Sequence, residues 1–355
     1  MSSKVKVGII GLGAIGNVHI DSLRKTPDAE IAALCDGIPD RLKAKGEAIG
    51  CKNLYADFRE MVRQPDLDAV VVAVPNFVHC DATVAALKAG KHVLCEKPMA
   101  LNAKQAKLMV DTAKSSKKLI QMGMPWRQTA EGELLKKMID EGYFGKIYHL
   151  HLCMRRRRGV PGLGGWFTTK AMSGGGCLID IGVHFIDLVM WLSDNWKPER
   201  VSAVTYSEFG KRMRNYTYVG MWAGPPKFDG VCDVDDYASG IVRFSKGCTL
   251  TFELSWAANI KQESYAEIIG DKAGVRAFDG NPITIFTEAG GRLLDVSPQY
   301  GKVAQFDVQA AKFIGAIQGK NPVPATGEQG MTVMQVLDGI YKSAKDGKEV
   351  VIGKV

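Results

Sequence analysis

The feature that most constrains the fold of this chain is a glycine-rich turn between a short apolar run and a helical pattern. Val5 to Ile10 is mostly apolar and leads directly into Gly11-Leu12-Gly13-Ala14-Ile15-Gly16. A helical pattern follows from Asn17 to about Lys25. Glycines at these spacings permit a tight turn and close packing of a helix on a strand. The beginning of the chain therefore predicts a strand–turn–helix unit.

Strand and helix patterns alternate throughout residues 1–124. Ala69 to Val74 is apolar without alternation, which is typical of a strand covered on both faces. Other strand patterns cover Ile31–Cys35, His92–Cys95 and Leu119–Gly123, and helical patterns begin near Pro39, His79 and Asn102. Repeated strand–helix units with short links predict a doubly wound parallel sheet.

The pattern changes after Gly123. Helices are expected at Thr129–Glu141, Gly174–Leu192, Val303–Ile317 and Gln329–Lys345, with a strand at Ile147–Met154 and several more after Val201. The connections between the later strands are hairpin-like, as at Ser245-Lys246-Gly247, and favour a mostly antiparallel sheet. We therefore predict an α/β domain over residues 1–124, followed by an α+β domain over residues 125–355.

Length, composition and charge exclude several classes of protein. A chain of 355 residues exceeds the size at which one core usually stops growing, so two domains are expected. Hydrophobic residues make up 46% and charged residues 24%, which excludes a disordered or collagen-like chain. No uncharged apolar run approaches the ~20 residues that span a bilayer.

The net charge is +8, and the one dense run of positive residues, Arg155 to Arg158, indicates a positive patch or an anion-attracting cleft rather than a nucleic-acid site. We expect neither a nucleic-acid nor a membrane partner.

The eight cysteines are scattered without a CxxC pair, and several lie in apolar strand patterns, as Cys35 and Cys95 do. This distribution is typical of reduced thiols that act as small hydrophobes, not of a disulfide framework or a zinc site. We therefore expect no bound metal. Lys4 and Lys6 interrupt the first apolar stretch, so no signal peptide is predicted and a cytoplasmic location is expected.

The glycine turn and Asp36 together predict a dinucleotide site. Such a turn also occurs without a ligand, but here Asp36 lies 20 residues after Gly16, at the end of the second predicted strand. The start of the helix supplies N–H groups to phosphates, and Gly13 lets the backbone approach them. The candidate cofactor residues of the turn are Gly11, Gly13, Ala14, Ile15 and Gly16.

Asp36 also bears on the choice between NAD and NADP. A carboxylate can accept hydrogen bonds from the ribose hydroxyls and would repel a 2′-phosphate, so NAD is favoured. Arg41 lies close in sequence and is the residue that could read a 2′-phosphate instead.

Two further motifs carry side chains suited to acid–base chemistry. Lys97, in Cys95-Glu96-Lys97-Pro98, follows a predicted strand of the parallel sheet, where functional groups of such sheets gather. A surface lysine at a turn is the alternative. Asp180 and His184 are four residues apart in a helical pattern, so they share a face and suit proton transfer if that face lines a cleft. A metal site, which lacks a convincing third ligand, and a hydrogen-bonded core histidine are the alternatives.

Taken together, these motifs resemble the glucose-fructose oxidoreductase/inositol dehydrogenase/MocA family. The resemblance is carried by the GLGAIG turn, Val74-Pro75-Asn76 with His79, Glu96-Lys97-Pro98, and GGGxxxDxGxH from Gly174 to His184. It covers essentially the whole chain. It implies a Rossmann domain joined to an open-faced antiparallel sheet with helices on one face, and homodimers or homotetramers formed through that sheet.

The resemblance also implies roles for single residues. Lys97, Asp180 and His184 match the family's catalytic trio, and Arg127 matches a position beside the nicotinamide and the substrate. The other cofactor residues that it implies are Pro75, Asn76, His79, Glu96 and Lys97, and the substrate residues are Trp126, Arg127, Arg158, Trp166, Asp180 and His184. Trp126, Trp166, Tyr237 and Trp256 are also candidates for stacking on a sugar ring, with a core aromatic as the alternative for each.

A narrower resemblance concerns Arg156-Arg157-Arg158-Gly159-Val160-Pro161 with Trp166-Phe167. It is similar to the subgroup of levoglucosan dehydrogenase and the bacterial glycoside 3-dehydrogenases, which often has proline where this chain has Cys177. It implies an NAD-dependent dehydrogenase that oxidises a ring hydroxyl, with C3 as the best choice, of a sugar, glycoside or cyclitol. A hydrolase that oxidises its sugar, eliminates the aglycone and re-reduces the sugar is the main alternative. A non-catalytic NAD-sensing regulator is the third, and it predicts lost site residues.

The strands after Val201 predict a sheet with two faces, and few helices are available in this domain to cover them. The apolar candidates for burial by a second copy, across both faces, are Val242, Phe244, Leu250, Phe252 and Leu254. We predict a homo-oligomer, with a tetramer preferred over a dimer.

Overall fold

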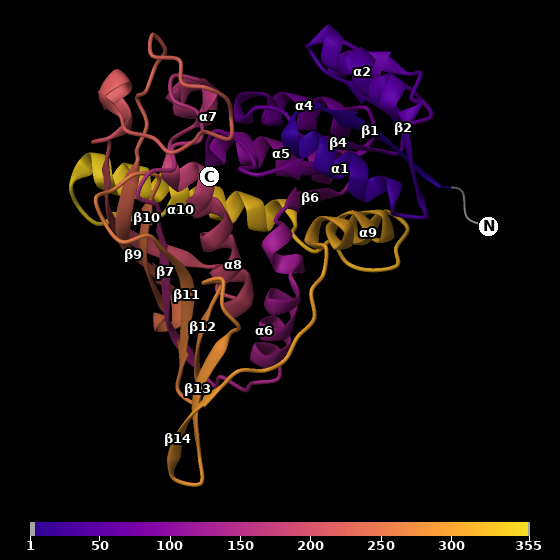
Figure 1. Ribbon diagram of the computed structural model, residues 1–355. Helices are drawn as coiled ribbons and strands as arrows, with labels where there is room; N and C mark the ends of the chain where they lie inside the picture. The colour runs from indigo at the N-terminus through magenta and orange to yellow at the C-terminus, as the bar shows by residue number, and fades with distance from the viewer. Residues whose placement is uncertain (1–3, 354–355) are drawn as a thin grey trace. The chain divides into compact units, whose positions relative to one another are not determined.

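The structure is a computed structural model that describes residues 4–353, and its internal contacts divide the chain into two compact units. The first unit comprises the residues up to Gln128 together with Val303–Met331. The second comprises Thr129–Lys302 and the residues from Thr332 onward. The chain therefore leaves the first unit and returns to it before it ends in the second (Figure 1). The predicted boundary between residues 124 and 125 separates cofactor binding from substrate binding, and this division of function stays a prediction.

The first unit is built on a six-stranded sheet in the order β3-β2-β1-β4-β5-β6, with every neighbouring pair parallel. The strands are β1 (Val5–Ile10), β2 (Ala29–Cys35), β3 (Leu54–Tyr55), β4 (Ala69–Val72), β5 (His92–Glu96) and β6 (Ile120–Gly123). All four residues of β4 are buried, as its unalternating apolar sequence predicts. The strand order reverses beside β1, where doubly wound sheets bind ligands. The predicted α/β fold is confirmed.

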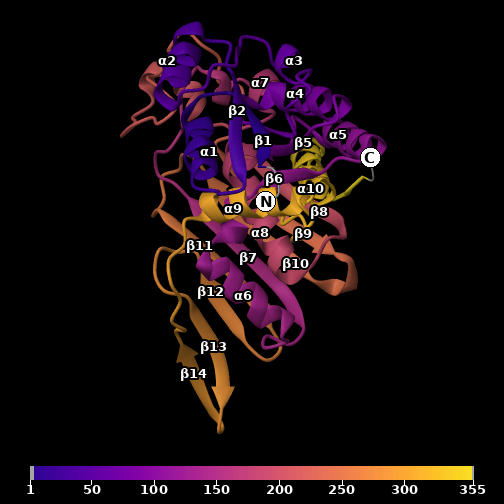
Figure 2. The same cartoon turned by 90° about the vertical axis from the view of Figure 1, so that its right-hand side faces the viewer.

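Helices follow the strands of this sheet and complete its core. They are α1 (Ala14–Arg24), α2 (Pro39–Ile49), α3 (Phe58–Met61), α4 (Asn76–Lys88) and α5 (Ala103–Ser116). A late helix, α9 (Gln305–Ile317), lies beside α1 in both ribbon views (Figures 1 and 2). Its buried Phe313 and Ile314 join the apolar core of β1, β2 and α1.

The second unit contains a nine-stranded sheet in the order β14-β13-β12-β11-β7-β10-β9-β8-β15. Its strands are β7 (Ile147–Arg155), β8 (Pro198–Tyr206), β9 (Tyr237–Phe244), β10 (Thr249–Ser255), β11 (Glu263–Gly270), β12 (Gly274–Ala277), β13 (Thr284–Ala289), β14 (Arg292–Val296) and β15 (Val350–Val351). Only β7 and β10 pair in parallel, so the predicted mostly antiparallel sheet is confirmed. The helices are α6 (Ala130–Asp140), α7 (Lys170–Ser173), α8 (Val183–Ser193) and α10 (Gly327–Asp346), the last of which begins in the first unit.

One face of this sheet is covered by helices of its own unit. α8 packs against β7 and β11, and α6 packs against α8 (Figure 1). The apolar residues that were expected on both faces are all buried within the chain, at no more than 2% exposure: Val242, Phe244, Leu250, Phe252 and Leu254. Alternation along paired strands places them on the covered face, so the expectation that some await a partner is wrong. The opposite face, here called the open face, carries Cys153, Arg155, Tyr237, Glu253, Glu263, Tyr265 and Arg276.

Among residues 4–353, one helical stretch, Lys170–Ser193, has the length and apolar composition of a membrane span. In the structure, 89% of its most apolar window is buried inside the protein. It therefore serves as the core helix of the second unit, since the apolar side chains that give it this composition contact other parts of the chain.

Candidate active site

The glycine turn has the geometry that its predicted roles require. Gly11 has a φ of +94°, and a Cβ there would lie 2.3 Å from the carbonyl oxygen of Ala73, so glycine is needed. A Cβ at Gly16 would lie 2.0 Å from the carbonyl oxygen of Gly11, which explains how closely α1 packs on the turn. No atom lies within 4 Å of a Cβ built at Gly13. The protein thus leaves space beside the first N–H groups of α1, from Ala14 onward, which fits a pyrophosphate.

Asp36 is buried at the end of β2 and holds this turn in place. Its Oδ2 accepts a hydrogen bond from the N–H of Leu12 at 2.8 Å, and its Oδ1 accepts one from the N–H of Ile38 at 2.8 Å. The guanidinium of Arg41 donates to the same Oδ2 at 3.3 Å. The two residues that were predicted to discriminate between a ribose hydroxyl and a 2′-phosphate are therefore in direct contact beside the turn.

A buried pair supports the turn that carries Lys97. Glu96 Oε1 lies 2.7 Å from Nε2 of His19 on α1, and Glu96 Oε2 accepts the N–H of Lys97 at 3.2 Å. A Cβ at Gly123, at the end of β6, would lie 2.8 Å from Glu96 Oε1, so glycine makes room for this carboxylate. Glu96 thus connects α1, β6 and the main chain of Lys97. Lys97 itself is half-buried.

His79 joins the loops that follow β4 and β5. Its Nδ1 lies 2.7 Å from the carbonyl oxygen of Pro98, and its Nε2 lies 2.8 Å from that of Val74. Burial lowers the pKa of His79, and the two carbonyls act in the opposite direction because they favour a ring that donates twice. Pro75 precedes α4, and Asn76 is its buried first residue. The side chain of His79 therefore fixes the loop in which these predicted cofactor residues lie.

Arg127, at 1% exposure, occupies a short helical turn, Pro125–Gln128. Its guanidinium donates to the carbonyl oxygen of Pro324 at 2.9 Å and to Oε1 of Gln329 at 2.7 Å. Both partners lie in the returning segment of the first unit, so Arg127 ties that segment to the end of the parallel sheet. Trp126 in the same turn is half-buried. The predicted contacts of these two residues with nicotinamide and substrate stay predictions.

The three glycines before the candidate acid–base residues are required by what packs against them. Gly174 has a φ of +86° and ends α7. A Cβ at Gly175 would lie 2.0 Å from the hydroxyl oxygen of Tyr341, and one at Gly176 would lie 1.8 Å from the carbonyl oxygen of Asp235. The glycines therefore admit a hydroxyl and a carbonyl to distances that side chains would prevent.

Asp180 and His184 lie on different kinds of helical turn. The structure has a π-helical turn, Leu178–Gly182, before α8, where a single long helix was predicted. Such turns are frequent at functional sites and space residues differently from an α-helix. The carboxylate of Asp180 is buried at 8% exposure and accepts a hydrogen bond from the indole N–H of Trp256 at 3.0 Å. His184 is half-buried in the first turn of α8. The segment thus carries a buried carboxylate and, on the next turn, a half-buried imidazole.

The other candidates for substrate contact already have partners within the second unit. Arg158 donates to Asn259 Oδ1 at 2.9 Å, and its guanidinium lies 4.6 Å from the ring centroid of Phe209. Trp166 is half-buried and stacks on Phe167, with ring centroids 3.8 Å apart. The half-buried ring of Trp166 therefore keeps part of its surface available for a ligand.

Two aromatic candidates for sugar stacking have other roles. Trp256 is 1% exposed, so the alternative of a core aromatic holds. Tyr237 lies on the open face and donates to Glu253 Oε1 at 3.0 Å. Burial and the neighbouring Glu253 raise the pKa of Tyr237 to about 12.

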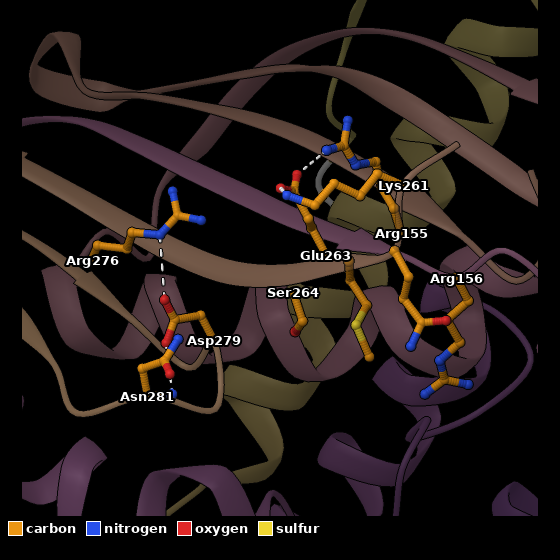
Figure 3. A pocket seen from close by; sticks show the side chains of 10 residues that line it. Arg155, Arg156, Lys261, Glu263, Ser264, Arg276, Asp279 and Asn281 are labelled. Carbon is orange, nitrogen blue, oxygen red and sulfur yellow. Dashed lines mark hydrogen bonds and ion pairs between the residues drawn. The ribbon is translucent and has the colours of Figure 1, made fainter. Parts of the chain in front are cut away.

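A pocket of about 420 Å³ lies where β7 ends and β11 begins (Figure 3). Four cationic side chains line it: Arg155, Arg156, Lys261 and Arg276. Figure 3 shows Arg155 paired with Glu263 and Arg276 paired with Asp279. Arg155 also contacts Glu253, and Arg276 also contacts Glu267 at 3.0 Å. These acidic partners offset the charges of Arg155 and Arg276, and the expectation that the arginine run attracts anions stays a prediction.

Cysteines and potential metal ligands add no further site. All eight cysteines are free thiols and six of them are buried. Burial raises the pKa of Cys35 and of Cys95 to about 12, so both stay protonated at neutral pH. Within residues 4–353, no group of three or more His, Cys, Asp or Glu side chains could hold a metal ion.

Sequence reasoning did not single out His19, Asp235 or Tyr341. Asp235 reaches the glycine segment from 57 to 59 residues away, and Tyr341 reaches Asp235 from 106 residues away. No local spacing pattern records contacts of this range. The consecutive acids Asp235-Asp236 before a strand were the one available signal, because paired acids in such a position are seldom left without donors when buried.

Comparison with known proteins agrees with this arrangement. Residues 5–124 match the family model described as an oxidoreductase family with an NAD-binding Rossmann fold, and residues 133–276 match the GFO/IDH/MocA C-terminal domain. The chain is 33% identical to D-glucoside 3-dehydrogenase of Escherichia coli K12, over 98% of both proteins. It is 25% identical to myo-inositol 2-dehydrogenase of Thermotoga maritima, over 99% of both. A levoglucosan dehydrogenase structure with NADH and L-sorbose shares the fold, with a TM-score of 0.87, 23% identity and full coverage of both chains.

The contrasting surroundings of Gly11 and Gly13 yield a prediction. Gly13→Ala should fold normally, because the added methyl meets no protein atom, but it should raise the NAD dissociation constant at least about 10-fold by filling the phosphate space. Gly11→Ala should lower the free energy of unfolding by about 1–3 kcal/mol because of its positive φ. Urea unfolding and calorimetric titration with NAD measure the two effects. Unchanged NAD affinity in Gly13→Ala would show that the cofactor does not use this space.

Proposed function

The chain belongs to the glucose-fructose oxidoreductase/inositol dehydrogenase/MocA family of NAD-binding oxidoreductases, and from this premise we propose that it uses NAD to oxidise a secondary ring hydroxyl of a sugar, glycoside or cyclitol. The observation that carries the proposal is the buried Asp180 carboxylate with the half-buried His184 imidazole on the next turn. The name of the D-glucoside 3-dehydrogenase, identical at 33% of positions, supports a glycoside as substrate and C3 as the carbon oxidised.

In the proposed reaction, residues of this chain handle one proton and one developing charge. When bound, NAD accepts the hydride that leaves the carbinol carbon. His184 removes the hydroxyl proton, since an imidazole titrates near working pH and can return to its starting state without a large pKa change. Lys97 donates a hydrogen bond to the reacting oxygen and stabilises negative charge that develops on it. Asp180 orients either the substrate hydroxyls or the imidazole.

We assign cofactor binding to residues 1–124, and substrate binding and oligomerisation to residues 125–355. The space beside Gly13 and the N-terminus of α1 support pyrophosphate binding. The buried Asp36 supports NAD over NADP, because a 2′-phosphate would meet its negative charge. A cytoplasmic location is supported by eight free cysteines, since secreted proteins usually oxidise theirs.

We also propose that a second copy of this chain covers the open face, in a homodimer or homotetramer. The helices of the second unit pack on the opposite face. The open face includes Val204 and Tyr206, which are 44% and 51% exposed. Its charges alternate in sign along neighbouring strands, as in the Glu253–Arg155–Glu263 row, and such a row can be complementary to itself across a two-fold axis.

Replacing Asp36 with Ser tests the cofactor preference. The change removes the ribose acceptor and also the carboxylate that binds the N–H of Leu12, so NAD affinity should fall by at least about 10-fold, the lower limit for one hydrogen bond to a charged group. The ratio of the NADP dissociation constant to the NAD dissociation constant should also fall. Titrations of both cofactors measure this, with Arg41→Ala as the matched variant that keeps the carboxylate. If the wild-type protein binds NADP more tightly than NAD, the assignment of Asp36 is wrong and Arg41 reads the phosphate.

The acid–base assignment predicts the behaviour of two variants. His184→Ala and Lys97→Ala should each lower kcat by about 10²–10⁴-fold, the usual cost of losing a general acid or base, while NAD affinity changes little. The assay follows NADH formation from methyl β-D-glucopyranoside and other glycosides. Full turnover by both variants would place the acid–base work elsewhere. A glycoside whose aglycone is released without NADH accumulation would establish the redox-cycling hydrolase instead.

The oligomer proposal predicts a molar mass of two or four chains in light scattering at micromolar concentration. Val204→Asp places a charge on the open face, where it costs little in an isolated chain because Val204 is 44% exposed. It should shift the protein toward monomers while thermal unfolding of the monomer stays cooperative. A wild-type protein that scatters as a monomer would remove this proposal.

A further inference from the structure

Two consecutive buried aspartates, Asp235 and Asp236, lie behind the π-helical turn that carries Asp180. They precede β9 in sequence and are 7% and 2% exposed. Burial of two adjacent carboxyl groups is costly unless donors compensate it. The hydrogen-bond donors that contact Asp235 and Asp236 therefore indicate which parts of the structure the two residues hold in place.

Asp235 binds three successive N–H groups at the start of the helical segment. Its Oδ1 accepts the N–H of Gly176 at 2.8 Å and its Oδ2 accepts that of Leu178 at 2.9 Å. Its carbonyl oxygen accepts the N–H of Cys177 at 2.9 Å. The hydroxyl of Tyr341 donates to Oδ1 at 2.7 Å and fixes the carboxylate from the other side. Burial, followed by the charge of Asp235, raises the pKa of Tyr341 well above its usual range, so this hydroxyl remains a donor.

The hydrogen bonds of Asp235 also fix the main chain of Asp180. The N–H of Asp180 donates to the carbonyl oxygen of Gly176 at 3.0 Å, and the N–H of that glycine is held by Asp235. A change in the position of Asp235 therefore moves the first turn of the segment and, with it, the origin of the Asp180 side chain.

The side chain of Asp180 is held through the neighbouring aspartate. The carbonyl oxygen of Asp236 accepts the N–H of Trp256 at 2.9 Å, and the indole N–H of Trp256 donates to Asp180 Oδ2 at 3.0 Å. The Asp236 carboxylate accepts the N–H groups of Glu208, Phe209 and Gly210, which anchor it. Trp256 is 1% exposed, so its indole has little freedom to turn away from the carboxylate.

We propose that Trp256 and Asp235 are positioning residues for Asp180: Trp256 holds its carboxylate, and Asp235 holds its main chain. The inference rests on the proposed function, because it gives Asp180 a role in the reaction. Neither residue needs to touch the substrate. An indole donor also favours the ionised form of the carboxylate that accepts it. Loss of the indole N–H should therefore alter the rate and its pH dependence more than it alters stability.

The test is a double-mutant cycle of Trp256→Phe and Asp180→Ala. Trp256→Phe keeps an aromatic ring and removes the donor. It should lower kcat for methyl β-D-glucopyranoside by about 10–100-fold, the range for a hydrogen bond to a charged group, and leave the NAD dissociation constant unchanged. The acidic limb of the kcat/KM profile, which the proposed mechanism assigns to His184, should move to higher pH, because a carboxylate without the indole donor stabilises the protonated imidazole more strongly. In the Asp180→Ala background, the same change should alter kcat less than about 2-fold.

Two controls separate positioning from a loss of stability. Trp196→Phe makes the same chemical change in the loop before β8 and should leave kcat and the pH profile unchanged. Tyr341→Phe removes one donor from the Asp235 carboxylate and should lower kcat by about 2–10-fold with little change in KM, because only part of this lost hydrogen bond is transmitted to the position of Asp180. Equal losses from Trp256→Phe with and without Asp180, or an unaltered pH profile, would overturn the proposal.

A measurement without turnover keeps the inference testable if Asp180→Ala is inactive. The indole N–H proton of Trp256, assigned by its absence in Trp256→Phe, should shift in the NMR spectrum of Asp180→Ala and stay in place in Trp196→Phe. An unshifted indole proton would contradict the inference. If Asp180→Ala instead retains full activity, the proposed role of Asp180 fails, and the NMR result still decides whether Trp256 holds its carboxylate.

Discussion

In both units, a buried aspartate binds main-chain N–H groups of a glycine-rich segment at the start of a helix, and the rest of the proposed site depends on this interaction. Asp36 holds Leu12 beside the turn that precedes α1, and Asp235 holds Gly176 and Leu178 before the π-helical turn. The carboxylate satisfies helix-end donors that would otherwise need another partner. Both segments also require glycines: a Cβ at Gly176 would lie 1.8 Å from the carbonyl oxygen of Asp235, and a Cβ at Gly11 would lie 2.3 Å from that of Ala73.

The two aspartates differ in their distance along the sequence from the N–H groups that they bind. This separation decides how well each interaction could be predicted. Asp36 follows the next strand of the same strand–helix–strand unit, so the spacing from Gly16 predicts it directly. Asp235 is brought to Gly176 by the folding of the second unit, across 59 residues and a long loop. The glycines at 174–176 were visible in the sequence, but their partners were not. The same reason explains why α9, which completes the core of the first unit, was assigned only as a helix and not to that unit.

Periodicity alone also gave an incomplete description of the second unit. It predicted the strands and their mostly antiparallel pairing, but not which face of the sheet each apolar residue occupies. Val242, Leu250 and Leu254 share the covered face because pairing aligns their alternation, and the open face holds charged and aromatic side chains instead. The π-helical turn could not be predicted from the sequence either, because one extra residue in a helical turn leaves the apolar pattern of Leu178 to Leu192 almost unchanged. These features depend on packing between strands and helices that are distant in sequence.

Transfer of a hydride from a defined ring carbon to NAD is the central claim, and isotopic labelling measures it most directly. The protein is incubated with NAD and methyl β-D-glucopyranoside that carries deuterium at a single ring carbon, and the NADH formed is analysed by mass spectrometry. The proposed function predicts one deuterium in NADH when the label is at C3 and none when it is at C2 or C4. Formation of NADH that carries label from C2 or C4 would contradict the choice of carbon. The absence of any labelled NADH from glycosides, simple sugars and cyclitols would contradict the proposed activity.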